Sequence, residues 1–141
     1  MTSFREAVYS SLFGLVSSSD LFVTATRRIK EYADVDQATQ PAILQLELGE
    51  KWAEPGTPPQ AVTLRARLYI YCESNDPTQP VSTQINAALD AVADALAPDD
   101  VDERQTLNGL VYNTAITGEV TIAEGLSGQS EAIVPIEIML G

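Results

Sequence analysis

The residues of this chain that could do chemistry are a single cysteine and 20 acidic side chains, and the sequence contains no histidine. Histidine is the commonest general base and a common metal ligand. Its absence excludes Ser-His and Cys-His nucleophile pairs and imidazole metal sites. Cys72 lies on the apolar side of an alternating segment, where a cysteine is usually a small buried hydrophobe and not a nucleophile. We therefore predict that Cys72 belongs to the core.

Four acidic residues stand close together in the second half of the chain: Asp99, Asp100, Asp102 and Glu103. Clustered carboxylates suit a hard cation such as Ca²⁺ or Mg²⁺. The run nevertheless lacks the glycine turn and the distal bidentate glutamate of a calcium loop. We interpret it as a solvated acidic run between two elements.

The longest period-two alternation, AVTLRARLYIYCE over residues 61–73, predicts the central strand of a sheet. Residues 81–96 follow a turn at 74–77, and their helical spacing predicts a helix that folds back onto the apolar face of this strand. The other face of the strand is amphipathic and carries Thr63, Arg65, Arg67, Tyr69 and Tyr71.

The N-terminal region predicts a helix followed by a short strand. Ser3 and Glu6 form a capping-box pattern ahead of an apolar stripe, so residues 3–16 predict a first helix. Residues 21–27 are rich in β-branched and aromatic side chains and predict a short strand. We expect residues 29–41 to form a polar connection.

A second short strand is predicted at residues 42–48 and is expected to pair with the central strand. Residues 49–60 contain three prolines and two glycines, which predict a long exposed loop between the two strands. Trp52 falls in this segment and has two interpretations. Its ring either folds back over the edge of the sheet or serves as an anchor for a partner.

Two further strands are predicted at residues 110–122 and 130–140. The segment between them contains GLSG at 125–128, which is not followed by Lys and Ser or Thr, and it precedes a strand. It therefore predicts a hairpin turn and not a phosphate loop. Pro135 cannot donate to a ladder and predicts that the last strand lies at an edge or contains a bulge.

These elements predict one α+β domain over residues 1–141. The expected architecture is a mainly antiparallel or mixed sheet with the two helices packed on one face. A chain of 15.2 kDa with 45% hydrophobic residues is long enough to bury a core. No apolar run approaches the roughly 18 residues of a membrane span. The single cysteine and the absence of a signal-like start favour a reducing cytoplasm.

The formal net charge of -12 disfavours a direct grip on nucleic acid. Only Arg27, Arg28 and Lys30 cluster, and three cations are too few for a surface that tracks phosphates. Arg65 and Arg67 alternate with tyrosines, and we expect Glu47 or Glu137 to lie near them. Such cross-strand pairs contribute about 0.2 to 1 kcal/mol each, so we expect this face to serve contacts or solubility.

The order of the elements is carried by six stretches: REAVYSSLFGLV, TRRIKEYADV, QPAILQLELGE, LRARLYIYCESND, INAALDAVADAL and AIVPIEIML. In this succession and with these lengths, they resemble the tail terminator proteins of long-tailed bacteriophages and prophages, the minor tail protein U-like group. The resemblance covers nearly the whole chain.

The resemblance implies a structural role without enzyme activity and without a cofactor. Proteins of this family form a six-fold ring at the head-proximal end of the tail tube. The ring stops polymerisation of the tube protein and offers a surface to the connector or head-closure protein. Viral DNA passes through the ring without specific binding, so the implied location is the virion, after assembly in the host cytoplasm.

Two sets of residues follow as hypotheses about such a ring. The expected ring or partner interface consists of Glu50, Lys51, Trp52, Arg65, Arg67 and Tyr69. The expected acidic lining of the lumen consists of Asp99, Asp100, Asp102 and Glu103, because carboxylates there would keep phosphates from sticking. Two alternatives remain open: another neck protein, such as a head-closure protein, or a small ligand-binding α+β domain.

Overall fold

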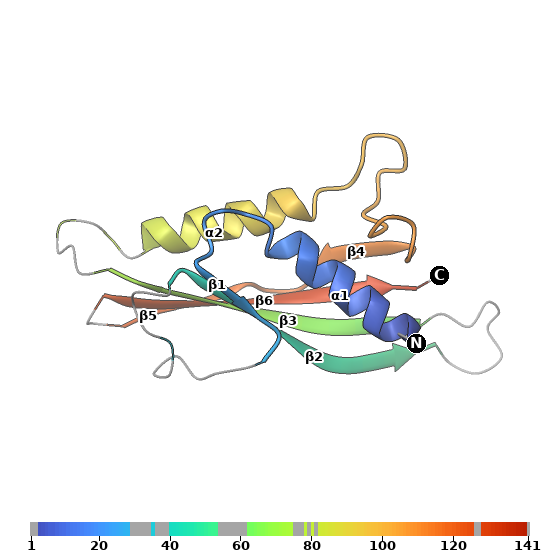
Figure 1. Cartoon of the computed structure of the whole chain (residues 1–141), viewed down its shortest axis with the longest axis horizontal. Helices are drawn as coiled ribbons and strands as arrows, with labels where there is room; N and C mark the ends of the chain where they lie inside the picture. The colour runs from blue at the N-terminus through green and yellow to red at the C-terminus, as the bar shows by residue number, and fades with distance from the viewer. Residues whose placement is uncertain are drawn as a thin grey trace.

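The computed structural model describes residues 3–28, 35, 40–53, 62–74, 78, 80, 82–125 and 128–140. In the described residues, the chain forms two helices and six strands (Figure 1). Their order is α1 (Phe4–Val16), β1 (Thr24–Thr26), β2 (Ala42–Trp52), β3 (Val62–Glu73), α2 (Ser82–Ala95), β4 (Asn113–Ile116), β5 (Thr121–Glu124) and β6 (Gln129–Met139). None of the described helices is long and apolar enough to cross a membrane.

Strand β3, which the sequence predicted as the central strand, lies in the middle of the sheet. The sheet has the order β1-β2-β3-β6-β4, and β5 also pairs with β6. β1 and β2 are parallel, whereas all other neighbours are antiparallel. Strand β3 is therefore flanked by the two other long strands, which gives the sheet three long strands in its middle and short ones at its margins.

Both helices lie on one face of the sheet, as predicted (Figure 1). Val8 and Leu12 of α1 and Ile85 of α2 are fully buried against the apolar face of β3. Burial of a Leu, Ile or Val side chain contributes about 1.5 to 3 kcal/mol, so this interface is the main source of stability. The α+β fold class predicted from the sequence is confirmed.

Helix α1 begins where the capping pattern predicts. The Ser3 hydroxyl accepts a hydrogen bond from the Glu6 backbone N–H at 3.0 Å. The Glu6 carboxylate pairs with Arg27. The helix is fixed to the sheet by Gln45, which is buried and donates from Nε2 to the Tyr9 carbonyl at 3.0 Å. The Tyr9 hydroxyl in turn donates to the Arg65 carbonyl at 3.2 Å.

Strand β2 is longer than predicted. The expected loop began at Gly49, but Gly49–Trp52 continue the ladder with β3 up to the pair Trp52 and Val62. A bulge between Glu47 and Gly49 makes this possible, and Gly49 adopts φ +107°, which side chains rarely allow. The prediction of an exposed loop was therefore wrong for residues 49–52. Its proline-rich part, 54–60, lies outside the described residues.

The predicted strand 110–122 is two short strands, β4 and β5, which both pair with β6. The break includes Gly118 at φ +74°. It lies beside Pro135, whose carbonyl accepts from the Thr117 N–H at 3.1 Å while its nitrogen has no hydrogen to donate. The expectation of an edge strand or bulge was wrong, because β6 is paired on both sides. Pro135 lies where the partner strand changes from β4 to β5.

The remaining predicted elements differ from the structure only in their bounds, as far as the structure describes them. β1 is shorter than the expected strand 21–27, and α2 spans Ser82–Ala95 of the expected 81–96. Of the predicted connection 29–41, the structure describes positions 35, 40 and 41. The turn at 74–77 lies outside the described residues except for Ser74, and the turn at 125–128 except for its two glycines.

The face opposite the helices is covered at one end only. Val35, Ala42, Leu44 and Tyr71 form a second, smaller buried cluster there. Tyr69 is half-buried beside it. The rest of that face stays open in the described part of the chain.

Burial in α2 gives a first prediction. Ile85→Ala should reduce the free energy of unfolding by about 2 to 5 kcal/mol, because Ile85 is fully buried between helix and sheet. Leu89 is only half-buried at the margin of the core, so Leu89→Ala should cost clearly less than Ile85→Ala. Chemical denaturation of both variants measures this difference. Equal losses would contradict the placement of α2.

Candidate interaction surface

The candidate functional surface is the open face of the sheet, which we define by the side chains of β2, β3 and β6 that point away from the helices. Cross-strand partners share a face, and the register places Pro135 opposite Arg67 and Ile133 opposite Tyr69. On the other side of β3, Leu46 lies opposite Arg67. Arg65 is exposed, whereas Arg67, Tyr69 and Leu46 are half-buried. The open face thus mixes cations, an aromatic ring and apolar side chains.

A hollow of about 290 Å³ lies on this face, between the middle of β3 and the connection from β4 to β5. Its walls include two arginines, two glutamates, a proline and a leucine. The lining residues with side chains or backbone on the hollow are Leu48, Arg65, Ala66, Arg67, Thr117, Gly118, Glu119, Pro135, Ile136 and Glu137.

Glu47 and Glu137, the two carboxylates predicted near Arg65 and Arg67, lie on opposite faces of the sheet. Glu137 lies directly opposite Arg65 in the register, but these two residues form no ion pair in the described structure. Arg67 donates from Nη1 to the Tyr69 hydroxyl at 3.3 Å. Of the two carboxylates predicted as alternatives, Glu137 therefore lies beside an arginine, whereas Glu47 shares a face with the core residue Ala66 and points to the helix side.

Glu47 belongs to an ion cluster that ties α1 to β2. Arg27 binds the carboxylate of Glu6, and its Nη2 lies 2.5 Å from Oε1 of Glu47. The hydrogen bond from Arg27 lowers the pKa of Glu6 below its usual value. Arg27 is therefore a clamp on the helix side, although the sequence grouped it with Arg28 and Lys30.

Two of the six predicted interface residues, Glu50 and Trp52, also lie on the helix side. Nε of Arg5 is 2.7 Å from Oε1 of Glu50, and Nε1 of Trp52 donates to Oε2 of Glu50 at 2.7 Å. The hydrogen bond from Arg5 lowers the pKa of Glu50. Trp52 is 51% exposed and thus does not cover the edge of the sheet as a buried cap. Its role as a partner anchor stays a prediction.

The other four predicted interface residues come together on the open face. Lys51 lies opposite Thr63, which follows the same alternation as Arg65, Arg67 and Tyr69. The structure thus divides the predicted set between the two faces. The alternation of the sequence could not show which face of β2 points to the helices, because both faces carry apolar residues at the start of the strand.

The acidic residues at 99–103 form an exposed turn after α2, which we call the acidic turn. Oδ1 of Asp99 accepts hydrogen bonds from the backbone N–H groups of Val101 at 2.8 Å and Asp102 at 2.6 Å. Asp99, Asp100, Asp102 and Glu103 are all exposed, which confirms a solvated run. In the described part of the chain no three potential ligands are grouped for a metal ion.

Val101 is not among the residues predicted for a site, and its side chain is 90% exposed at the tip of this turn. The available signal was its isolation, because it is the one apolar residue between four carboxylates. In Figure 1 the segment between α2 and β4 rises from the helix side, away from the sheet.

Cys72 is fully buried in the core, as predicted. Burial raises the pKa of its thiol to about 11, because the charged thiolate is poorly solvated there. The thiolate form that attacks electrophiles or binds metals is thus strongly disfavoured at neutral pH.

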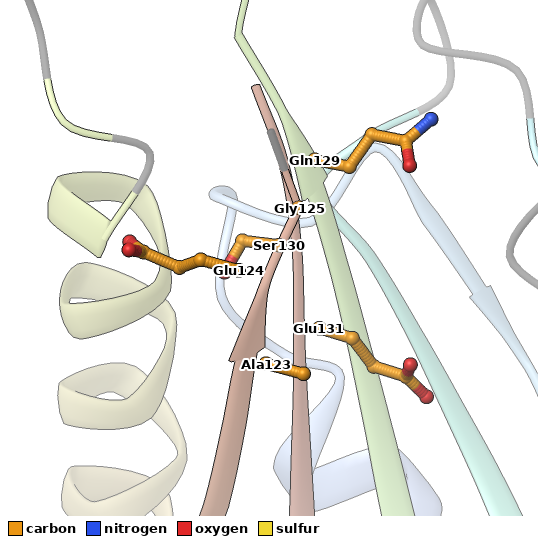
Figure 2. A pocket seen from close by; sticks show the side chains of 6 residues that line it. All are labelled: Ala123, Glu124, Gly125, Gln129, Ser130 and Glu131. Atoms are coloured by element: carbon orange, nitrogen blue, oxygen red, sulfur yellow. The ribbon is translucent and has the colours of Figure 1, made fainter. Parts of the chain in front are cut away.

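A second hollow, of about 280 Å³, lies at the β5–β6 hairpin. Figure 2 shows that the side chains of Glu124 and Ser130 point toward α2, whereas those of Gln129 and Glu131 point to the opposite side. Burial raises the pKa of the Glu131 carboxyl. The polar groups diverge, so the hairpin does not present a convergent set of ligands.

Compared with known proteins, the chain matches no protein-family model and no curated protein sequence.

The ion pairs of α1 give a prediction on pH. The folded-state pKa values of Glu6 and Glu50 are lowered, so their contribution to stability is present above the unfolded value near 4.5 and is lost as pH falls through the folded values. In the double variant Glu6→Gln plus Glu50→Gln, urea unfolding between pH 6 and pH 3 should lose part of this acid dependence. The exposed Asp94→Asn of α2 serves as the control. A double variant with the wild-type profile would show that the clamps do not stabilise α1.

Proposed function

We propose that this protein is a structural component of a phage particle, a tail terminator that forms a ring at the head-proximal end of the tail tube. The observation that carries the proposal is the one-sided fold: two helices cover one face of the sheet, and most of the other face is open in the described residues. The resemblance of the successive sequence stretches to tail terminators supplies the particular assignment.

The composition of the open face supports a contact role. Interfaces are enriched in arginine and tyrosine and combine them with apolar side chains, as on this face with Arg67, Tyr69 and Leu46. An antiparallel sheet tolerates water on one face, but a purely solvated face needs no such mixture. The open face therefore fits a surface that another protein covers after assembly.

The proposed partners are further copies of the chain, the tail tube protein and the connector or head-closure protein. A chain with net charge -12 repels DNA, which fits a ring through which the genome passes without specific binding. The exposed acidic turn is available either to line the lumen or to meet a neighbouring protein.

The ligand-binding alternative receives less support from the geometry. The two hollows described, of about 280 and 290 Å³, fall just below the roughly 300 to 1,000 Å³ of usual small-molecule pockets. At the β5–β6 hairpin the polar side chains around the hollow also point away from one another (Figure 2).

The purified protein should form closed rings that are visible by negative-stain electron microscopy. The ring fraction in sedimentation velocity should rise between about 0.01 M and 0.15 M salt, because the Debye length shrinks from about 30 Å to about 8 Å and repulsion between acidic copies is screened. A monomer under all these conditions, even after addition of tail tubes, would contradict the proposal.

Removal of the gene from the phage or prophage that carries it should produce tails of uncontrolled length that do not join heads. Electron microscopy of lysates measures the length distribution. Tails of normal length that fail to bind heads would instead favour the head-closure alternative, and normal particles would exclude both roles.

A further inference from the structure

Positive charge is distributed unevenly between the two sides of the molecule. On the helix side, Arg5 and Arg27 are held by carboxylates of their own chain, and the guanidinium of Arg104 stacks 4.2 Å from the centre of the Tyr112 ring. On the open face, Lys51, Arg65 and Arg67 form no ion pair in the described structure. These three cations are thus available to a partner.

Negative charge gathers on the opposite side. Asp90 and Asp94 lie on the exposed side of α2, and the acidic turn that follows adds four more exposed carboxylates. The helices cover the face opposite the three cations (Figure 1). We call the open face, which carries these three cations together with Glu131 and Glu137, the front, and the acidic helix side the back.

The acidic back also carries an apolar projection. Val101 is 90% exposed, and the two backbone hydrogen bonds to Asp99 hold the turn in the shape that presents it. Asp100 and Asp102 flank it in sequence. An apolar side chain that an ordered turn holds in water gains free energy when a partner buries it.

The front carries a matching depression. The hollow of about 290 Å³ has apolar walls from Leu48 and Pro135 and is bordered by Arg65 and Arg67. It is larger than an isopropyl group. Glu119 and Glu137 also line it and oppose an acidic partner, so any attraction must come from the two arginines and from burial of apolar surface.

We propose that the acidic turn of one copy seats in this hollow of the next copy, with Val101 as the apolar anchor and Asp100 and Asp102 beside Arg65 and Arg67. The occupant is a second copy because the exposed turn of this chain supplies both an apolar side chain for the apolar walls and carboxylates for two arginines that hold no ion pair in the described structure. The contact joins two different surfaces, so it is heterologous and generates a closed ring or an open filament. Only the choice of a closed ring rests on the proposed function.

The anchor is tested by Val101→Glu, with Val23→Glu as the matched control, since Val23 is also exposed, at 60%, but lies next to β1. Sedimentation velocity over a concentration series should show self-association weakened at least about tenfold for Val101→Glu and unchanged for Val23→Glu. Equal association of Val101→Glu and the wild type would overturn the proposal.

The hollow is tested by Arg65→Glu plus Arg67→Glu, with the exposed Arg28→Glu as control. The double variant should lose self-association while its urea midpoint falls only slightly. Neither arginine holds an ion pair within the described chain, and the cost comes from the carboxylate that the reversal at Arg65 places opposite Glu137. If the double variant does not fold, Thr117→Glu places a carboxylate in the hollow without touching the arginines and must give the same loss.

Cysteine crosslinking tests the pairing of the two surfaces directly. Val101→Cys and Thr117→Cys, oxidised separately, should stay monomeric on non-reducing gels, and their mixture should give dimers only. The variant with both cysteines should give a ladder of larger species. Native Cys72 is buried and serves as the silent background in all arms. Dimers of Val101→Cys alone would show a symmetric contact and overturn the proposal.

The outcomes separate this contact from the proposed function. Rings that form normally in the Val101 and Arg65 plus Arg67 variants overturn the contact and leave the ring proposal standing. A crosslinked ladder without closed rings or tail termination supports the contact and contradicts the proposed function.

Discussion

The constraint on which this structure depends is that two helices must cover a sheet with three long strands. The apolar face of β3 is the common surface: β2 and β6 pair with it on either side, and both helices pack on the face that these strands share. The buried side chains there supply the hydrophobic stabilisation. Because this cover is one-sided, the described residues leave the opposite face open, apart from the small cluster around Val35 and Tyr71.

Polar contacts decide where α1 lies over β2. Arg5 and Arg27 bind carboxylates of β2. The Gln45 side chain of the sheet donates to the Tyr9 carbonyl of the helix, and the Tyr9 hydroxyl donates to the Arg65 carbonyl of the sheet. Apolar contact is not directional, so burial alone would let the helix slide or rotate. The same contacts pair Arg5 and Arg27 with carboxylates. Most cations that form no ion pair in the described residues therefore lie on the open face.

Much of the fold could be predicted from local periodicity. The alternation of β3 and the spacing of α2 were clear because each has one apolar side, and Ser3 marked the start of α1. The sequence did not reveal which side of β2 faces the helices, because Ala42 and Leu44 are buried on one side and Ile43 and Gln45 on the other. Glu47 was therefore predicted only as an alternative to Glu137. The break between β4 and β5 depends on Pro135 of the neighbouring strand β6. The sequence around the break therefore could not predict it. For three of the six predicted interface residues, Arg65, Arg67 and Tyr69, the sequence did predict the face correctly. They lie on β3, whose apolar and polar faces the alternation distinguishes.

The interruption opposite Pro135 has a consequence for how copies can meet. It divides one margin of the sheet into β4 and β5, with four residues each. At the other margin the three-residue β1 pairs only with Ala42–Leu44, and the rest of the β2 edge is interrupted by the bulge between Glu47 and Gly49. Short, discontinuous margins are poor templates for adding a strand from another chain, which is the usual route to uncontrolled aggregation. In the described part of the chain, association is thus directed away from main-chain pairing and toward side chains. Side-chain contacts can be specific for a single geometry, and the proposed ring, which must close after a fixed number of copies, requires such specificity.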